Sequence, residues 1–353
     1  MQYVYEEGGK AMARYVTFGE VMLRLKPPGF ERFLQSPFLE ASFGGAEANV
    51  AVGLAHFNCD VAFVSLIVPN PVGDQCIAEL QRHGVDTSHI SRKGNRLGIY
   101  FLESGATQRP SSIIYDRAGS GMSSVRQGDV PWEEVFKGAS WFHISGITPA
   151  LSASAAEVSL EAVNTARASG VTVSCDLNYR KKLWQYGKQP HEVMREIVQH
   201  ADVVVGNEED YQRSISMKVE VDVEGGSLDT AVYDKLTAGV FERFANLRAA
   251  AVTLRSSHSA SYNSWQAVLR TKERFFVSKR YEIQPIVDRV GSGDAFAAGL
   301  IFGLDTGLPD GDALEFATAA GCLKHSIPGD FPVLSVDEVR SLASGGGSGR
   351  IQR

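Results

Sequence analysis

No apolar stretch of the sequence reaches the roughly 20 residues that a membrane-spanning helix requires. The first residues also lack the apolar core of a secretory signal, because Glu6, Glu7 and Lys10 place charges there. We therefore expect a protein that makes no use of a membrane and works in the cytoplasm. Residues 1–12 are expected to form a disordered leader, and residues 344–353 a glycine-rich flexible tail.

Cysteine is scarce, and a surplus of positive charge is absent. The four cysteines show neither C-x-x-C nor Cys/His metal spacing, which indicates free thiols in a reducing compartment. The formal net charge is −6 and no basic stripe emerges, which argues against a nucleic-acid partner. An acidic protein that binds an anion must use local arginines or lysines. The few arginines near the motifs described below therefore matter more than the total charge.

Apolar runs rich in β-branched residues alternate with helical segments along the 353 residues. The expected strands are Tyr15–Leu25, Val61–Val68, Trp141–Ser145, Val171–Leu177, Val203–Val205 and Ala250–Leu254. The expected helices are Asn49–His56, Gly73–His83, Ser152–Ser169, Pro190–Gln199, Tyr233–Phe244, a helix from Asp294, and Asp312–Ser326. This alternation predicts an α/β fold with a mostly parallel central sheet and helices on both faces. Ligands of such sheets bind beyond the carboxyl ends of the strands.

A turn of small residues runs into an apolar helix at Asp288–Gly299. Glycines let the backbone turn tightly, and the first N–H groups of a helix lack intrahelical partners and carry the positive end of its dipole. Such a turn suits the charge on a phosphoryl group in transfer. Asp294 stands where a carboxylate can accept a proton from an attacking hydroxyl. Taken alone, a glycine turn with Asp at a helix start is also common structural punctuation.

A second glycine turn, Phe43–Asn49, leads into another small-residue helix, for which close helix–sheet packing is the ordinary interpretation. Together the two turns resemble the paired signatures of the PfkB (ribokinase-type) carbohydrate kinases, and the resemblance runs from about Val16 to about Pro332. It implies a ribokinase-like fold, ATP and Mg²⁺ as cofactors, and Asp294 as catalytic base. It further implies an anion hole built from Gly291, Ser292 and Gly293, and a sugar site that includes Gly44, Gly45 and Asn49.

The segment 97–120 breaks the alternation, because it holds two short strand-like runs, Ile99–Glu103 and Ser112–Tyr115, and no helix. With Val21–Pro27 they predict a small sheet that stands off the body, and an ordinary surface hairpin is the alternative. In the family that it resembles, such a sheet is a lid over the sugar. We therefore expect one kinase domain over residues 13–343, with a lid from about 21–27 and 97–120. Apolar side chains on both faces of this sheet, and the family's habit of pairing through lids, predict a homo-oligomer.

Four stretches resemble the members of that family that act on the sugar acid 2-keto-3-deoxygluconate, namely Gly98–Glu103, Tyr115–Ser120, His143–Leu151 and Asp176–Arg180. The residues implied in binding the sugar acid are Gly45, Tyr100, Tyr115, Arg117 and Arg180. The chemistry is reasonable, because an aldonic acid needs a cation for its carboxylate and arginine offers a planar fork of donors. A surface arginine at 117 and half-buried strand aromatics at 100 and 115 are the ordinary alternatives.

Donor recognition rests on weaker similarity. The stretch Val203–Asp210 resembles the family's N-x-x-E segment, with Asp210 in place of Glu, and implies that Asp210 organises Mg²⁺ through water. A helix that opens with acids is the alternative. Serines and a histidine in 255–260 replace a glycine-rich nucleotide loop. The resemblance implies the following ATP-binding residues: Asn178, Arg180, Asn207, Arg255, Ser257, Ser259, Gly291, Gly293 and Thr318.

These observations predict an ATP-dependent kinase for the terminal hydroxyl of 2-keto-3-deoxygluconate, with Asp294 as base and the amides of Gly291–Asp294 as anion hole. A fructokinase or ribokinase is the alternative within the enzyme class, because neutral sugars need no arginine. A sugar-acid sensor that has lost turnover is the alternative from another class. Expected partners are the sugar acid, ATP and further copies of the chain.

Overall fold

The structure of the protein, a computed structural model, describes residues 14–217 and 230–346. The predicted leader and the end of the predicted tail lie outside these residues. The ten strands of the central sheet are β1 (Arg14–Phe18), β4 (Asp60–Ile67), β5 (Ile90–Arg92), β8 (Ala139–Ser145), β9 (Thr172–Asp176), β10 (Val203–Gly206), β11 (Ala249–Ser259), β12 (Tyr262–Thr271), β13 (Phe275–Val277) and β14 (Tyr281–Ile283). Their order is β13-β12-β11-β10-β9-β8-β1-β4-β5, and β14 pairs with β12.

The sheet is parallel from β11 to β5, as predicted, and β12 to β14 extend it by antiparallel pairing. Its central strands are buried on both faces: every residue of β10 and all but the first of β4 are buried. Continuous apolar runs of this kind are typical of parallel strands that are covered on both sides. The carboxyl ends of these strands therefore meet at one edge of the sheet.

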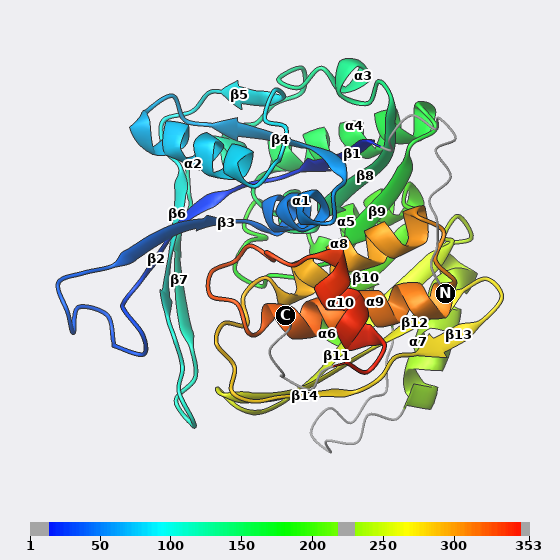
Figure 1. Cartoon of the computed structure of the whole chain (residues 1–353). Helices are drawn as coiled ribbons and strands as arrows, with labels where there is room; N and C mark the ends of the chain where they lie inside the picture. The colour runs from blue at the N-terminus through cyan, green and yellow to red at the C-terminus, as the bar shows by residue number, and fades with distance from the viewer. Residues whose placement is uncertain (1–13, 218–229, 347–353) are drawn as a thin grey trace.

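Helices cover both faces (Figure 1). One face carries α1 (Ala46–His56), α2 (Pro71–Arg82), α8 (Ser292–Asp305), α9 (Asp310–Lys324) and α10 (Val336–Ala343). The other carries α3 (Trp132–Val135), α4 (Ala153–Ala168), α5 (Pro190–Gln199), α6 (Glu208–Ile215) and α7 (Thr230–Arg243). Tyr15 of β1 packs against the helices of the first face and its neighbour Val16 against those of the second face, because successive side chains of a strand point to opposite sides. Among the described residues, no helix combines the length and the apolar character that crossing a bilayer demands.

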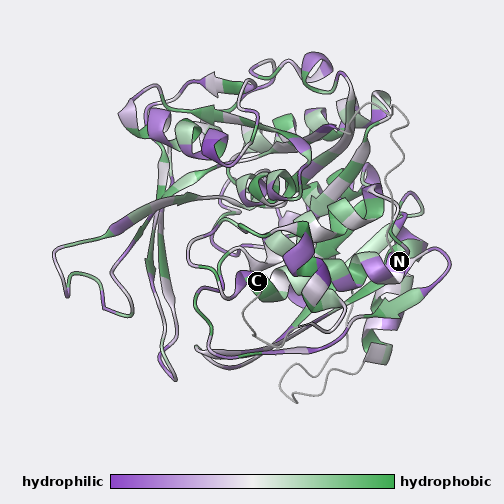
Figure 2. Ribbon diagram, in the orientation of Figure 1, coloured by the Kyte–Doolittle hydropathy of each residue, from purple (hydrophilic) through white to green (hydrophobic). Residues whose placement is uncertain are grey.

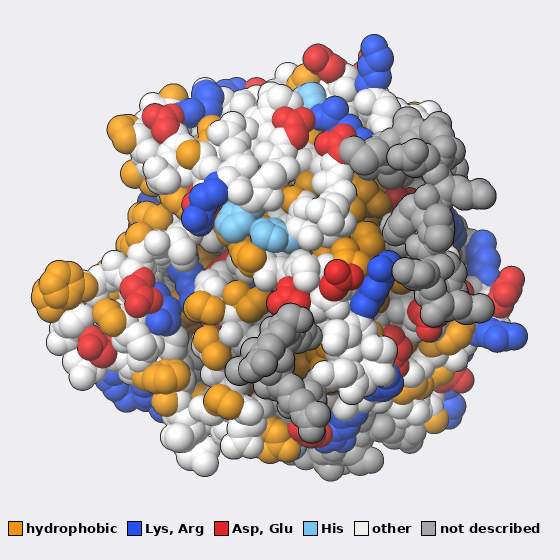
Figure 3. All heavy atoms as spheres, in the orientation of Figure 1, with side chains coloured by type: hydrophobic (Ala, Val, Ile, Leu, Met, Phe, Trp, Pro, Cys, Tyr) orange, Lys and Arg blue, Asp and Glu red, His pale blue; other side chains and the backbone are white. Residues whose placement is uncertain are grey.

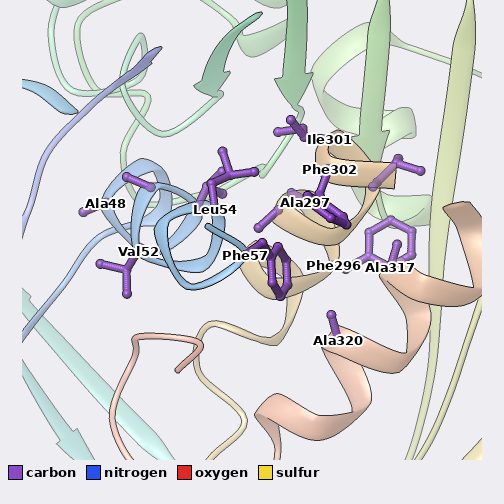
Figure 4. Packing of buried hydrophobic residues seen from close by; sticks show 14 of the residues in the cluster. Ala48, Val52, Leu54, Phe57, Phe296, Ala297, Ile301, Phe302, Ala317 and Ala320 are labelled. Atoms are coloured by element: carbon purple, nitrogen blue, oxygen red, sulfur yellow. The ribbon is translucent and has the colours of Figure 1, made fainter. Parts of the chain in front are cut away.

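Helices α1, α8 and α9 pack against one another through buried hydrophobic side chains (Figure 4), and glycines of α1 and α8 let the helices approach closely. A Cβ at Gly299 of α8 would stand 2.9 Å from Cα of Ala317, and one at Gly303 would stand 2.8 Å from Cβ of Ala313. These contacts hold α8 along its length between the other two helices. Most of α1 and α8 is buried, and both are coloured mainly as hydrophobic in Figure 2. A helix that is apolar nearly all round belongs in a core. Because the body of α8 is buried, the position of its polar first turn is fixed relative to the sheet.

A separate four-stranded sheet projects from the body, on the left of Figure 1. It consists of β2 (Met22–Lys26), β3 (Glu40–Gly44), β6 (Gly98–Glu103) and β7 (Ser112–Asp116), in the order β3-β2-β6-β7. The predicted small sheet is therefore present, and β3 is an additional strand. Arg24, Tyr100 and Tyr115 lie side by side on the face toward the body, and Leu25, Phe101 and Ile114 lie side by side on the other face.

One predicted element needs correction, and several elements were not predicted. The strand expected over 15–25 is two strands in different sheets, because the chain leaves the central sheet at Gly19, where a Cβ would collide with the Glu47 carboxylate. Strands β12 to β14 were not predicted; they form where the chain folds back after β11, with β12 pairing with β11 and both β13 and β14 pairing with β12. Helix α10 was not predicted, and α6 corresponds to the alternative of a helix that opens with acids; both are only eight residues long and begin with a capping box.

The glycine contacts generate a stability prediction. Gly299→Ala should lower the thermal unfolding midpoint, because overpacking against Ala317 costs about 1–3 kcal/mol, more than the gain of about 1 kcal/mol from better helix propensity. Gly239→Ala in α7 is the matched control, since the added methyl would meet only the flexible end of Met217. It should leave the midpoint unchanged or raise it. A Gly299→Ala variant as stable as the native protein would contradict the close helix contact.

Candidate active site

A cavity of about 1260 Å³ lies between the carboxyl ends of the parallel strands and the small sheet. Its lining comes from the ends of β9 and β10, the start of α1, the turn before α8, and strands β6 and β7. This is the edge of the sheet at which ligands of open parallel sheets bind. The predicted residues that line it are Gly45, Asn49, Tyr100, Tyr115, Arg117, Asn178, Arg180, Asn207, Asp210, Arg255, Gly291, Ser292, Gly293 and Asp294.

The turn before α8 presents backbone N–H groups to the cavity. Gly291 has φ 82°, a conformation that L side chains rarely adopt, and a Cβ there would collide with the carbonyl oxygen of Asp330. Helix α8 begins at Ser292, so the N–H groups of its first turn have no intrahelical acceptor. Nothing lies within 4 Å of the place where a Cβ of Gly293 would stand. The turn is therefore open to a ligand and suited to an anion.

Asp294 is half-buried in the first turn of α8, where Asn49 of α1 holds it. The Asn49 amide donates to the Asp294 carboxylate at 2.6 Å, and its oxygen accepts from the N–H of Gly45 at 3.2 Å. This bond joins the two glycine turns that lie almost 250 residues apart in the chain. Burial raises the pKa of Asp294 to about 6, although the bond from Asn49 opposes the shift. A carboxylate with this pKa can accept a proton near neutral pH.

Glu47 is a second carboxylate near Asp294, and the sequence interpretation missed it. It is buried, and its Oε1 accepts from the N–H of Ser145 at 2.9 Å and from the Thr148 hydroxyl at 2.7 Å. Burial raises its pKa to about 7. Glu47 thus ties the start of α1 to the end of β8 below the cavity. Its place inside the second glycine turn was the available signal.

Arg117 is nearly buried and already has an acidic partner. Its Nε donates to Glu20 at 2.8 Å, Nη2 also contacts Glu20, and the guanidinium lies 5.7 Å from the centre of the Tyr115 ring. Gly98 makes room for the pair, since a Cβ there would stand 2.9 Å from Glu20 Oε1. The alternative of a surface arginine at 117 is therefore wrong, because the side chain is buried and paired with Glu20. Arg180, in contrast, is exposed at the cavity and its hydrogen bond is to the carbonyl of Tyr179, at 2.9 Å.

Tyr100 does not offer a free hydroxyl, because it donates to the Asp330 carboxylate at 2.5 Å. Arg24 of β2 donates to the same oxygen at 2.6 Å and also pairs with Asp288. Asp330 lines the cavity, and burial raises its pKa, although Arg24 opposes the shift. Arg24 was not predicted as a site residue. It carries no local motif, so only the fold brings it to Asp330.

Asn207 and Asp210 open α6 with a capping box. Asp210 accepts from the N–H groups of Asn207 and Tyr179, both at 2.8 Å, and donates its own N–H to Asn207 at 3.0 Å. The helix-opening alternative therefore describes Asp210 correctly, and both of its carboxylate oxygens are engaged. Burial raises the pKa of Asp210, and it raises the pKa of Asp176 beside the cavity well above the usual range. Within residues 14–217 and 230–346, no group of three or more His, Cys, Asp or Glu side chains is placed to bind a metal.

Four predicted site residues, namely Gly44, Ser257, Ser259 and Thr318, are not among the residues that line the cavity. Gly44 packs against the Asp330 carboxylate, and Ser257 and Ser259 stand at the outer end of β11. Thr318 is fully buried inside α9, where its hydroxyl donates to the Leu314 carbonyl at 2.8 Å. The position of Thr318 along the predicted helix did not show whether its side chain faces the core or the cavity.

Comparison with known proteins agrees with this geometry. The description "pfkB family carbohydrate kinase" matches residues 12–330. A crystal structure of 2-dehydro-3-deoxygluconokinase from Thermotoga maritima is similar, with a TM-score of 0.90 and 44% identity, over 95% of this chain and 99% of that one. The 2-dehydro-3-deoxygalactonokinase of Haloferax volcanii is 33% identical over 96% of this chain and 98% of its own. The 2-dehydro-3-deoxygluconokinase of Bacillus subtilis is 28% identical over 92% and 93%.

The matched region contains both glycine turns, the small sheet and the cavity between them. The chain covers nearly the whole length of each relative, so the likeness extends over the complete kinase fold. The protein is a member of the pfkB family of carbohydrate kinases.

Proposed function

We propose that the protein transfers the γ-phosphoryl group of ATP to the terminal hydroxyl of 2-keto-3-deoxygluconate. One observation carries the proposal: a single cavity is lined both by Asp294 with its glycine turn and by two arginines that suit a carboxylate. The similarity to enzymes named for 2-dehydro-3-deoxy sugar acids supports an acid substrate. The names include both the glucono and the galactono compound, so the class of substrate is better supported than its epimer.

Asp294 is the base in this mechanism. Its carboxylate takes the proton of the terminal hydroxyl as that oxygen attacks the γ-phosphorus of ATP, and the bond to the bridging oxygen of ADP breaks. The N–H groups of Gly291–Asp294 stabilise the negative charge on the transferring group. Asn49 fixes the orientation of the base from the neighbouring helix.

Recognition of the acid falls to Arg180 and Arg117. Arg180 is exposed at the cavity, so its planar fork can bind a carboxylate in a bidentate way. Arg117 is held on its Nε and Nη2 side by Glu20, which leaves Nη1 for the sugar. Tyr115 contributes an exposed ring on the inner face of the small sheet, which acts as the lid over the substrate.

ATP occupies the part of the cavity near β9, β10 and β11, where Asn178, Asn207 and Arg255 line it. Both oxygens of Asp210 are engaged by backbone N–H groups, so direct coordination of a metal does not fit there. Water-mediated contact with Mg²⁺ does fit, since this ion keeps several waters and binds mainly through the donor phosphates. When bound, Mg²⁺ supplies charge neutralisation between the phosphates.

A neutral-sugar kinase of the fructokinase or ribokinase type is the second candidate. The pairing of Arg117 with Glu20 is the observation in its favour, because the acid neutralises part of the charge that a sugar carboxylate needs. Arg180 favours the sugar-acid kinase over the neutral-sugar kinase, since no acidic side chain forms an ion pair with it among the described residues.

We further propose that the protein assembles through the lid. Phe30, Leu34 and Phe38 of the β2–β3 loop are exposed, and Ile114 is 53% exposed on the outer face. Phe33 covers part of Phe101, but the outer face does not fold back onto the body. Figure 3 shows hydrophobic side chains at the projecting end of the molecule. An apolar surface of this kind is typical of a contact between subunits.

A substrate panel tests the function. ADP release should be at least tenfold faster with 2-keto-3-deoxygluconate than with fructose or ribose at equal concentration. Arg180→Gln should raise the KM for the sugar acid more than it lowers kcat, because the carboxylate is bound throughout the reaction. Faster turnover of a neutral sugar would favour the second candidate, and an Arg180→Gln variant with native kinetics would place the carboxylate elsewhere.

The base generates a prediction for Asp294. Asp294→Asn keeps the shape and removes the proton acceptor, so kcat should fall by about two to four decades with little change in sugar affinity. In the native enzyme kcat/KM should decline as the pH falls below about 6, since protonated Asp294 cannot accept a proton. Asp312→Asn, an exposed carboxylate at the start of α9, is the control and should behave as native. Near-native turnover of Asp294→Asn would remove it from the mechanism.

Light scattering at micromolar concentration tests the assembly. The native protein should have a mass that is a multiple of 38.3 kDa. The double variant Leu34→Glu, Ile114→Glu should be monomeric, because it buries charge in the contact. Val72→Glu, on the exposed side of α2, is the matched control and should assemble normally. A native mass near that of one chain would contradict assembly through the lid.

A further inference from the structure

Lys324 is fully buried directly beneath the glycine turn, and the mechanism above does not use it. It is the last residue of α9, and its ammonium donates to the carbonyl of Ile327 at 3.0 Å. Its Cε lies 3.4 Å from the position that a Cβ of Gly291 would take. The Lys324 side chain therefore lies against the glycine turn, and Lys324 is not among the residues that line the cavity.

The charges around Lys324 come from every element packed against it. These charged residues are Asp288 in the turn, Asp294 in α8, Asp330 in the loop after α9, and Arg24 in β2. Burial lowers the pKa of Lys324. The three carboxylates oppose this shift, and Arg24 adds to it. Asp288 and Asp330 already pair with Arg24. Lys324 is therefore not needed as their ion-pair partner.

The balance of charge shows what the ammonium adds. Arg24, Asp288, Asp294 and Asp330 together carry +1 − 3 = −2 when all are ionised, and Lys324 brings the cluster to −1. The site must accept the γ-phosphate of ATP, and repulsion between like charges is strong where water is excluded. A cation under the turn offsets this repulsion. A buried ammonium costs several kcal/mol in desolvation, and a methionine would fill the same space without that cost.

We propose that Lys324 is a positioning residue of the kinase, a built-in cation that acts through the glycine turn and Asp294. It strengthens the binding of the donor phosphates at the N–H groups of the turn, and it keeps Asp294 deprotonated at neutral pH. The inference rests on the proposed kinase activity only for its kinetic readout, since nucleotide binding reports on the same charge.

The effect of the Lys324 charge on proton transfer is measured through the protonation of Asp294. The groups that face it are Asn49 and Glu47 of α1, Asp176 and Arg180 near the end of β9, Asp330, and Lys324. Lys324 and Arg180 hold its pKa down, while burial and Asp330 raise it. Removal of the Lys324 charge must therefore move the acidic limb of the rate profile to higher pH.

Lys324→Met tests the proposal, with the exposed Lys272→Met as matched control. Expected for Lys324→Met are a tenfold to hundredfold loss of kcat, a change of less than threefold in the KM for the sugar acid, and an acidic limb at higher pH. The Kd for ATP, measured by calorimetry, should rise at least threefold. Lys272→Met should match the native enzyme in every measurement. Native kcat, native limb and native ATP affinity in folded Lys324→Met would overturn the proposal.

Two further measurements keep the test decisive. If no sugar of the panel is turned over, the proposed function fails, and ATP affinity alone decides the role of Lys324. If Lys324→Met does not fold, the native enzyme is assayed in potassium chloride and in choline chloride at equal ionic strength. A built-in cation predicts rates within twofold of each other. A strong requirement for potassium would overturn the proposal, because a cation from solution would then perform this role.

Discussion

Arg24 makes the contact on which the arrangement of the cavity depends. It lies on a strand of the small sheet, and its guanidinium binds Asp288 before the glycine turn and Asp330 after α9. Three segments far apart in the chain therefore meet at one buried side chain. Loss of one partner from such a pair costs about 3–5 kcal/mol, because it leaves a buried charge uncompensated. The small sheet is thus attached to the glycine turn before α8 and to the loop after α9.

The cavity has an unusual balance of charge for a site that binds two anions. Asp176, Asp210, Asp294 and Asp330 all line it, and burial raises the pKa of each. Each of these carboxylates accepts a hydrogen bond from another protein group, and the basic side chains around the cavity offset part of their charge. This distribution explains why an overall acidic chain can be a kinase. The sign of the local field, and not the net charge, governs the binding of ligand.

Much of the fold was predictable because its elements are local in origin. The helix at Pro190–Gln199 is present with those bounds, and the two glycine turns both feed helices at the cavity. The errors have different physical causes. Strands β12 to β14 form through pairing with β11 and with one another, and β1 and β2 separate because Gly19 lies against Glu47. The contact between Gly19 and Glu47 joins separate segments and leaves no pattern in a short window of sequence, whereas β11 to β14 are neighbours in the chain and their pairing is local.

The residues of the candidate site also fall into two groups, those identified by local motifs and those brought together only by the fold. Motifs of consecutive residues pointed to Asp294, Asn49, Gly291 and Gly293, because glycine at a turn and a carboxylate at a helix start have their meaning within a few residues. The partners of these groups come from elsewhere: Glu20 for Arg117, Asp330 for Tyr100, and Lys324 beneath Gly291. Burial and charge pairing depend on which segments the fold brings together in three dimensions. The sequence by itself therefore indicated which chemical groups belong to the candidate site. Their pKa values, their partners and the burial of the Thr318 side chain were decided only by tertiary packing.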